Sequence, residues 1–236
     1  MPDTTTPDTI TSDIKSKREE ILNRMAEAAK RAERPTNEID LVAISKVQPD
    51  ARVAAMLETG QKIFGENRVQ EMNTKAEHFD GQPVRWHHIG HLQTNKVKQA
   101  IRHAHLIHAV DSDRLLAEID KRSLNAGIQS RVLLQLHIAQ EAQKHGMTEA
   151  ELDTTLNALV GTQLGNTEIC GLMGMATFTD DTEQVRREFK SLRTLYDRYN
   201  PGHWDTCSMG MSGDWRIAVD EGSTLVRVGS AIFGSR

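Results

Sequence analysis

The sequence predicts a single α/β domain with the fold of a (β/α)8 barrel of the TIM type, preceded by an extra N-terminal helix. Short apolar runs alternate with longer amphipathic segments from residue 41 onward, and eight such runs can be distinguished. Strands that alternate with helices are typical of a parallel sheet, and eight strand–helix units close into a barrel. A doubly wound sheet is the weaker alternative, because "SKVQPD" follows the first run where that fold carries G-x-G-x-x-G.

The N-terminal segment, residues 1–11, is rich in Thr, Asp and Pro, and we expect it to be disordered. Residues 12–34 place apolar side chains among charges at helical spacing, which predicts an amphipathic helix with Ser12 or Asp13 as its N-cap. The predicted barrel domain, including this helix, spans residues 12–236.

Each apolar run is a predicted strand, and the amphipathic segment behind it is a predicted helix. In chain order, the pairs are 41–45 with 50–59, 62–64 with 67–79, 84–89 with 94–102, 105–110 with 112–125, 131–138 with 148–160, 168–173 with 182–199, 203–207 with 214–221, and 224–228 before the closing segment 229–236.

Composition excludes several classes of function. The chain has 29 Lys and Arg against 33 Asp and Glu, which gives no electrostatic reason to expect a nucleic-acid or anionic-membrane partner. Two cysteines without a C-x-x-C companion suggest neither a disulfide framework nor a zinc knuckle, and they fit a reducing compartment. The start of the sequence lacks the apolar core of a secretory signal, and no run of 18 apolar residues occurs. We therefore expect a cytoplasmic protein that acts on a small molecule.

A barrel of this kind carries its active site at the carboxyl ends of its strands. The segments at those ends are rich in polar and glycine residues. They are Ser45 and Lys46, then 65–67, 90–96, Asp111, 139–146, 173–178, 208–214 and 229–234.

The last two of these segments indicate a phosphate site. Gly229 permits close backbone approach, Ser230 offers a hydroxyl, and "AIFG" can form a short helical turn with exposed N–H groups. Ser208, Gly210 and Ser212 repeat this chemistry after the seventh predicted strand. The loops after strands seven and eight are the usual phosphate site of the fold, although a single Gly/Ser turn can also be a plain structural cap.

Arg227 and Lys46 add two cations to the same end of the barrel. Period-two alternation in "TLVRVGS" directs Arg227 into the barrel, where its partner is either a core carboxylate or an acceptor on a ligand. At the end of the first strand, partial burial near another cation would favour the neutral, nucleophilic amine of Lys46; the alternative is a lysine that simply extends to solvent. A Schiff-base lysine, a phosphate site and an arginine facing a ring nitrogen together fit pyridoxal 5'-phosphate (PLP).

Five stretches of the chain resemble the pyridoxal phosphate homeostasis protein family, whose fold is similar to the barrel domain of alanine racemase and is called PLP fold type III. They occur in the same order, over about residues 14–236. They are "LVAISKVQP", "FGENRVQE", "WHHIGHLQTNK", "CGLMGMAT" and "CSMGMSGDWRIAVDEGSTLVRVGSAIFG".

The resemblance implies a set of cofactor-binding residues. Lys46 would form the internal aldimine, Arg227 would face the pyridine nitrogen, and Asn67 would lie beside the cofactor. The phosphate would be held by Ser208, Gly229 and Ser230. The resemblance also implies that His88, Met209, Gly210 and Met211 lie near the pocket.

The sequence departs from the family pattern at four places. Arg68 stands where the family commonly has tyrosine, His88 where it has phenylalanine, and Ser230 where it has threonine. The stretch "LHIAQEAQKHG", which includes loop 139–146, replaces a "VNIS-E"-like sequence. Ser230 preserves the hydroxyl, so the groups needed for the aldimine and the phosphate are all present. The roles of Arg68, His88 and loop 139–146 are left open.

Catalysis is not expected, because racemisation needs a second base opposite the lysine. In alanine racemase that base is a tyrosine from beyond the barrel, whereas Tyr196 and Tyr199 of this chain lie on the predicted helix 182–199. An arginine at the ring nitrogen also weakens the electron sink. The leading hypothesis is thus a PLP-binding protein of vitamin B6 homeostasis. A small fold-type III racemase and a barrel enzyme using Lys46 on a sugar phosphate are the alternatives.

Partners and metals follow from the same reasoning. PLP is the expected ligand, other B6 vitamers and PLP-dependent apo-enzymes are candidate partners, and we expect a monomer because the second, dimerising domain of the racemase is missing. No metal site is expected around "HHIGH", because Gly90 interrupts any helix that would align His87 with His91 and no acidic third ligand stands at a recognised spacing.

Overall fold

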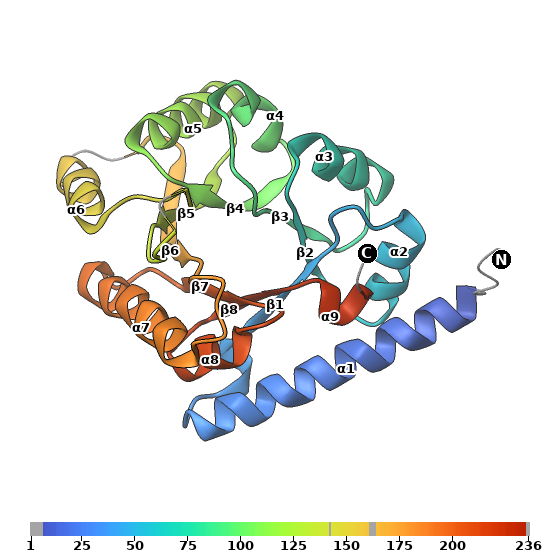
Figure 1. Ribbon diagram of the computed structural model, residues 1–236. Helices are drawn as coiled ribbons and strands as arrows, with labels where there is room; N and C mark the ends of the chain where they lie inside the picture. Colours follow the sequence, from blue (N-terminus) through green and yellow to red (C-terminus); the bar gives the residue numbers. More distant parts are fainter. Residues whose placement is uncertain (1–6, 142, 161–163, 235–236) are drawn as a thin grey trace.

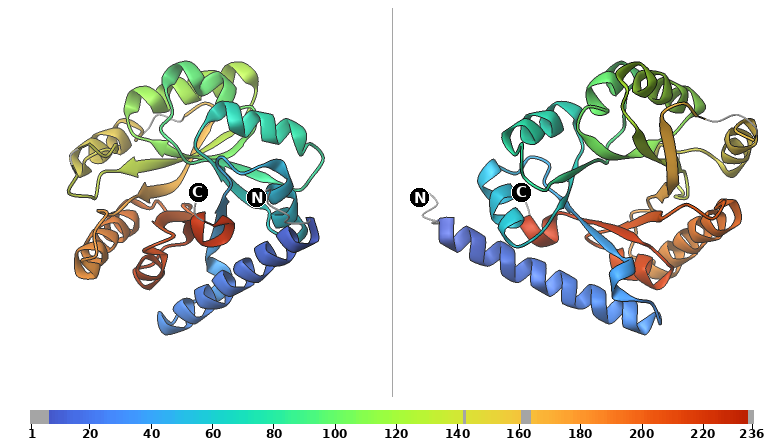
Figure 2. Two further views of the ribbon diagram at one scale, coloured as in Figure 1. Left: turned by 45° about the vertical axis from the view of Figure 1, so that its right-hand side comes forward. Right: turned by 180° about the vertical axis from the view of Figure 1, so that it is seen from behind.

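The computed structural model describes residues 7–141, 143–160 and 164–234. Within these residues eight parallel strands pair in the order β1 to β8, and β8 pairs with β1 to close a barrel. Helices surround the strands, as Figures 1 and 2 show from three directions. The predicted fold class is confirmed.

The strands are β1 (Asp40–Ile44), β2 (Ile63–Glu66), β3 (Arg85–His88), β4 (Ala104–Val110), β5 (Ser130–Leu136), β6 (Thr167–Gly174), β7 (Thr206–Met211) and β8 (Leu225–Val228). The α-helices are α1 (Pro7–Arg31), α2 (Asp50–Glu58), α3 (Val69–His78), α4 (Val97–Ala100), α5 (Asp113–Ala126), α6 (Glu149–Ala158), α7 (Thr182–Tyr199), α8 (Trp215–Asp220) and α9 (Ser230–Phe233). Two 3₁₀ turns, η1 (Thr36–Glu38) and η2 (Thr94–Lys96), precede β1 and α4.

The first helix begins earlier than the sequence predicted. It starts at Pro7, so residues 7–11 of the expected tail are helical, and Ser12 and Asp13 lie inside the helix and do not cap it. Residues 1–6 lie outside the described part of the chain. Proline is well tolerated in the first turn of a helix, which makes Pro7 a better start than the polar pair.

The seventh strand is displaced from its prediction. It was expected at 203–207, but it runs from Thr206 to Met211 and therefore includes all of "SMGM". Gly210 has a φ of +95°, and a Cβ there would lie 2.6 Å from the Cβ of Ala218 on α8. The glycine thus lets α8 pack closely on the strand, a tertiary requirement that made a strand segment look like a loop.

Helix α1 runs along the outside of the barrel, across α2, α8 and α9 (Figure 1). Its apolar stripe, which includes Ile14, Ile21 and Met25, is buried in one cluster with Ile232 and Phe233 of α9. Arg52 of α2 also donates a hydrogen bond to the carbonyl oxygen of Phe233. The last turn of the chain is thereby held against the carboxyl ends of β8 and β1.

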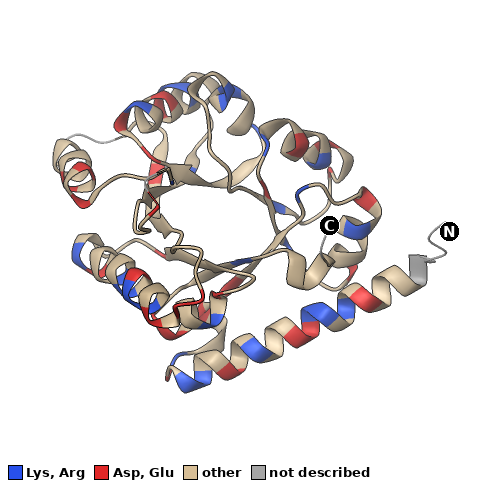
Figure 3. Cartoon of the chain, viewed as in Figure 1, with Lys and Arg blue, Asp and Glu red and all other residues tan. Residues whose placement is uncertain are grey.

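Charged residues of both signs are mixed along the outer helices. Figure 3 shows basic and acidic residues interspersed along α1 and α7, in agreement with the nearly balanced composition. Among the described helices, none is both long enough and apolar enough to span a lipid bilayer.

Candidate functional site

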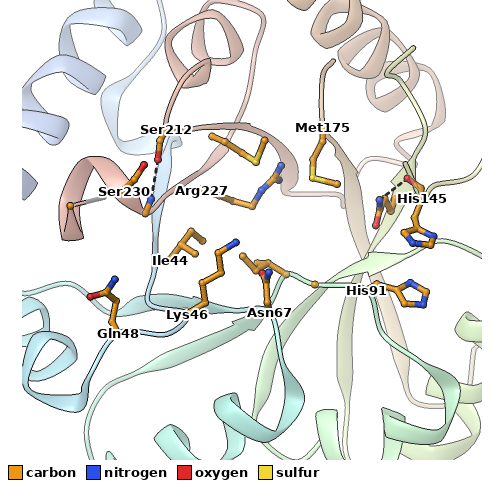
Figure 4. Close-up of a pocket in the computed structure, with 16 residues that line it drawn as sticks. Ile44, Lys46, Gln48, Asn67, His91, His145, Met175, Ser212, Arg227 and Ser230 are labelled. Carbon is orange, nitrogen blue, oxygen red and sulfur yellow. Dashed lines mark hydrogen bonds between the residues drawn. The ribbon is translucent and has the colours of Figure 1, made fainter. Parts of the chain in front are cut away.

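A cavity of about 490 Å³ lies at the carboxyl ends of the strands, within the range of roughly 300–1,000 Å³ that is typical of small-molecule sites. Its wall contains five of the nine residues predicted to bind a cofactor, namely Lys46, Asn67, Arg227, Gly229 and Ser230. In Figure 4 the side chains of Lys46, Asn67 and Arg227 point into the same space. The site thus lies where a (β/α)8 barrel places its chemistry.

Lys46 comes to the cavity because it continues the inward-facing positions of β1, after Val42 and Ile44. The peptide group that precedes it is held by a buried ionic network behind the strand. Lys75 of α3 donates to the carbonyl oxygen of Ser45 at 2.7 Å and to Glu66 Oε1 at 2.8 Å.

The Ser45 side chain belongs to the same network, because its hydroxyl donates to Glu66 Oε1 at 2.6 Å. Glu66 and Lys75 are both buried. Burial raises the pKa of Glu66, and the hydrogen bonds from Lys75 and Ser45 act against that rise. Burial of the Glu66 carboxylate therefore costs free energy, and the Lys75 ammonium stabilises the buried charge.

The peptide group that follows Lys46 is held from the same side. The N–H of Val47 donates to Glu71 Oε1, which also accepts from Lys75 at 2.9 Å. Val47 has a φ of +62°, a left-handed conformation that β-branched residues rarely adopt and that costs of order 1–3 kcal/mol. Glu66, Lys75 and Glu71 thus fix the backbone on both sides of Lys46.

Arg227 lies almost wholly inside the barrel, with 4% of its surface exposed. It donates to the carbonyl oxygens of Ser208 and Gly174, both at 3.1 Å, and to the Ser208 hydroxyl. No ion pair with a carboxylate forms within 4.0 Å in the part of the chain that is described. Burial lowers the pKa of Arg227 to about 10. A buried cation held by neutral acceptors is suited to an acceptor atom supplied by a ligand.

A hydrogen-bonded series behind Arg227 fixes its orientation. The Ser208 hydroxyl, which accepts from Arg227, lies 3.2 Å from His108 Nδ1, and His108 Nε2 lies 3.0 Å from His87 Nδ1. The series is consistent when each member donates to the next, which requires neutral imidazoles. Burial lowers the pKa of both His87 and His108 well below the ordinary value, so both are neutral near pH 7.

The turn between β8 and α9 brings the Gly229 backbone and the exposed Ser230 residue to the cavity wall. The Gly229 N–H donates to the Ser212 hydroxyl at 3.2 Å, and Ser230 follows at the first position of α9 (Figure 4). A Cβ on Gly229 would lie 3.1 Å from the Cβ of Ile44, so glycine keeps this part of the wall open. Ser212 belongs to the cavity wall and was noticed in the sequence only as a repeat of the Gly/Ser pattern.

The structure does not bring four predicted residues to the cavity wall. Ser208 is buried beneath Arg227, and Met209 packs outward in the apolar cluster that contains Cys207 and Ala218. Gly210 faces α8, as described above. These three placements follow from the corrected bounds of β7, and Met211 and Ser212 occupy the wall in their stead.

His88 is the fourth of these residues. It is one position past the inward-facing His87, so strand alternation directs it away from the cavity, on the same face as Trp86. Neither of its ring nitrogens has a hydrogen-bond partner in the described residues. Burial, followed by the charge of His91, lowers its pKa to about 4. Its neighbour across β2 and β3 is Glu66, so it lies behind the site.

A closed (β/α)8 barrel with a lysine after β1 and an inward arginine on β8 defines a protein of the alanine racemase barrel class, and the family model described as "Alanine racemase, N-terminal domain" matches residues 18–236. The chain belongs to the pyridoxal phosphate homeostasis protein family within that class. It is 36% identical to the pyridoxal phosphate homeostasis protein of Aquifex aeolicus over 220 residues, which cover 92% of this chain and 95% of the relative.

Two solved structures agree with this assignment. An unknown protein from Bifidobacterium adolescentis has a TM-score of 0.87 at 32% identity, covering 96% of both chains. PipY of Synechococcus elongatus, a COG0325 family member solved with PLP bound, has a TM-score of 0.78 at 34% identity, covering 91% of this chain and 100% of PipY.

Proposed function

We propose that this chain binds PLP in the cavity as an internal aldimine on Lys46 and serves intracellular PLP homeostasis without catalytic turnover. The observation that carries the proposal is the convergence of Lys46 and the buried Arg227 on one cavity whose wall ends in the Gly229–Ser230 turn. PLP has an aldehyde for the amine, a ring nitrogen for the guanidinium and a phosphate for the turn. The PLP-bound PipY and the names of the relatives support this choice.

Each group of the cofactor would meet a residue suited to it. Ser230, the Gly229 backbone and the Ser212 hydroxyl would hold the phosphate, and Asn67 would lie beside the ring. Arg227, a permanent cation that only donates hydrogen bonds, would keep the ring nitrogen unprotonated. An unprotonated ring is a poor electron sink, which favours binding over turnover.

The alternative, a small fold-type III racemase, needs a second base across from Lys46. The tyrosines of this chain do not provide it. Tyr196 donates to the carbonyl oxygen of Trp204, and burial raises its pKa to about 12, while Tyr199 donates to Asp153. His91 and His145 do line the cavity, and they are the imidazoles that would favour this alternative.

Reconstitution tests the proposal. Protein freed of cofactor and mixed with PLP is expected to bind one equivalent and turn yellow, and incubation with L-alanine or L-serine should yield no D-enantiomer above a protein-free control. Chiral chromatography measures the second result. Rapid exchange of enantiomers would establish the racemase, and a protein that stays colourless would favour an enzyme of sugar phosphates.

The proposal also covers the partners of the chain, its oligomeric state and its location in the cell. PLP-dependent apo-enzymes are the candidate recipients of the cofactor, and other B6 vitamers are candidate ligands. The chain is proposed to act as a monomer. A cytoplasmic location is supported by Cys170 and Cys207, which are buried as free thiols.

The placement of Ser208 beneath Arg227, and of Ser212 on the cavity wall, gives a testable distinction between the two serines. We expect Ser208→Ala to lower the free energy of unfolding by about 1–3 kcal/mol, because Arg227 and His108 lose a buried partner. Ser212→Ala should leave the free energy of unfolding nearly unchanged but weaken cofactor retention, because it removes the hydroxyl that is proposed to hold the phosphate beside the Gly229–Ser230 turn. Urea unfolding and dialysis of the loaded protein measure the two effects. Equal loss of cofactor with unchanged stability in Ser208→Ala would restore Ser208 to the phosphate site.

A further inference from the structure

Two imidazoles and one carboxylate from three different loops meet at one side of the cavity. His91 follows β3, Asp111 follows β4, and His145 lies in the loop between β5 and α6. One ligand atom from each lies within 4.8 Å of the others. Figure 4 shows His91 and His145 together, on the opposite side of the cavity from Ser212 and Ser230.

The distances fit a cation shared by the three side chains. Asp111 Oδ2 lies 3.3 Å from His91 Nδ1 and 3.9 Å from His145 Nδ1. A zinc ion binds imidazole nitrogen and carboxylate oxygen at about 2.0–2.2 Å, which places neighbouring ligands of a tetrahedral site roughly 3.4 Å apart. The rings of His91 and His145 are stacked, with centroids 4.4 Å apart, so both exposed side chains would turn out of this stack to direct one nitrogen each at a shared ion.

The scaffold holds the Asp111 side chain and the backbone of His145 in place without the ion. Asp111 directly follows β4, has only 13% of its side chain exposed, and accepts from the hydroxyl of Ser112, the N-cap of α5. The backbone of His145 is fixed by Gln135 of β5, whose amide donates to the His145 carbonyl oxygen at 2.7 Å. Ligand groups prepared in this way lose little conformational freedom on binding.

We propose that His91, Asp111 and His145 form a binding site for a divalent transition-metal ion of the zinc type. Two imidazoles and a carboxylate are a donor set for Zn²⁺ and its neighbours in the first row, not for Mg²⁺ or Ca²⁺, which prefer oxygen ligands alone. Three protein ligands leave coordination positions open. Both histidines line the cavity in which the cofactor is proposed to bind, so an ion held by them would lie at the edge of that cavity.

Motif spacing does not predict this site, because the carboxylate comes from a different loop than either histidine. Of the segment "HHIGH", only His91 belongs to the group of three. The cysteines are not competing ligands. Both are buried, and burial raises the pKa of Cys170 to about 11 and of Cys207 to about 12, so neither offers a thiolate.

The test is calorimetric titration with Zn²⁺ of the full-length, untagged chain, freed of cofactor and metal. We expect one ion per chain in the wild type. His91→Ala, Asp111→Asn and His145→Ala should each weaken binding by at least about tenfold, because even outer-shell partners of a metal ligand are worth 10–100-fold. Thermal unfolding without metal verifies that the variants are folded.

A matched control lies on the same protein. His78 and Asp50 form a surface pair with Nδ1 and Oδ2 3.7 Å apart, but no third ligand group is grouped with them among the described residues. His78→Ala should therefore bind Zn²⁺ like the wild type. Absence of binding in the wild type, wild-type affinity in Asp111→Asn, or equal weakening in His78→Ala would each overturn the proposal. Lys46→Ala should keep the Zn²⁺ site, so the metal and cofactor proposals can fail separately.

Discussion

Lys46→Ala is expected to abolish the near-visible absorbance band that PLP develops on the wild-type chain. The band of the proposed Schiff base requires the amine of Lys46. The Gly229–Ser230 turn and Arg227 remain able to bind PLP without a covalent bond. We therefore expect the variant to bind PLP at least about tenfold more weakly, a difference of about 1.4 kcal/mol, and to release it on dialysis. Absorbance and equilibrium dialysis measure the two effects.

Lys98→Ala is the control for this substitution, because Lys98 is an exposed lysine on α4, away from the cavity wall. It should retain the full band. Borohydride reduction of the loaded wild type should attach the cofactor to the peptide that contains Lys46, and mass spectrometry can locate it. An undiminished band in Lys46→Ala, or attachment to another lysine alone, would contradict the proposed role.

The fold could be predicted because the apolar runs of a parallel barrel are continuous and separated by amphipathic helices. The run before Lys46 is an example, since Val42 and Ile44 face inward and alternation carries the lysine to the cavity. Arg227 was predicted for the same reason. In both cases local periodicity decides the direction of the side chain, and local periodicity is what a single sequence contains.

The rest of the site depends on contacts between distant segments. Residue 210 is a glycine because α8 packs closely on β7 there, and with β7 running to Met211, Ser208 and Met209 are strand residues that do not line the cavity. The outward direction of His88 could have been predicted from strand alternation alone, because it follows the inward-facing His87. The resemblance to the family instead placed His88 near the pocket. The meeting of His91 with Asp111 requires the arrangement of two strand ends, which one sequence does not reveal.

The second large effect concerns stability. Lys75→Met is expected to lower the free energy of unfolding by about 3 kcal/mol at pH 7, because it leaves the buried carboxylate of Glu66 without its ammonium partner. It also frees the Ser45 carbonyl and one contact of Glu71, so the backbone beside Lys46 loses support. Urea unfolding measures the first effect. The intensity of the cofactor band at a temperature where the variant is folded measures the second.

The pH dependence of this effect follows from Glu66. Burial already raises the pKa of Glu66 in the folded wild type, so the folded state takes up a proton more readily than the unfolded state. For such a group stability falls as pH rises from the unfolded pKa, roughly 4.3, through the folded pKa. Without Lys75 the folded pKa is higher still. The difference in stability between Lys75→Met and wild type should therefore be largest near neutral pH and should shrink as the pH falls toward about 5.

A double-variant cycle isolates the carboxylate as the cause. Gln at position 66 carries no charge and can still accept from Ser45, so Glu66→Gln combined with Lys75→Met should be more stable than the sum of the single effects by at least about 1 kcal/mol. Lys98→Met, on the exposed face of α4, should change stability by less than about 0.5 kcal/mol. The changes in the free energy of unfolding could instead be additive, or the change for Lys75→Met could be the same at pH 5 and pH 7. Either result would mean that solvent or Ser45, and not Lys75, stabilises the Glu66 carboxylate. A positive coupling energy between the two substitutions, together with recovery of the cofactor band in the double variant, would show that the buried ion pair positions Lys46. Loss of packing alone would not be reversed by removing the charge at position 66.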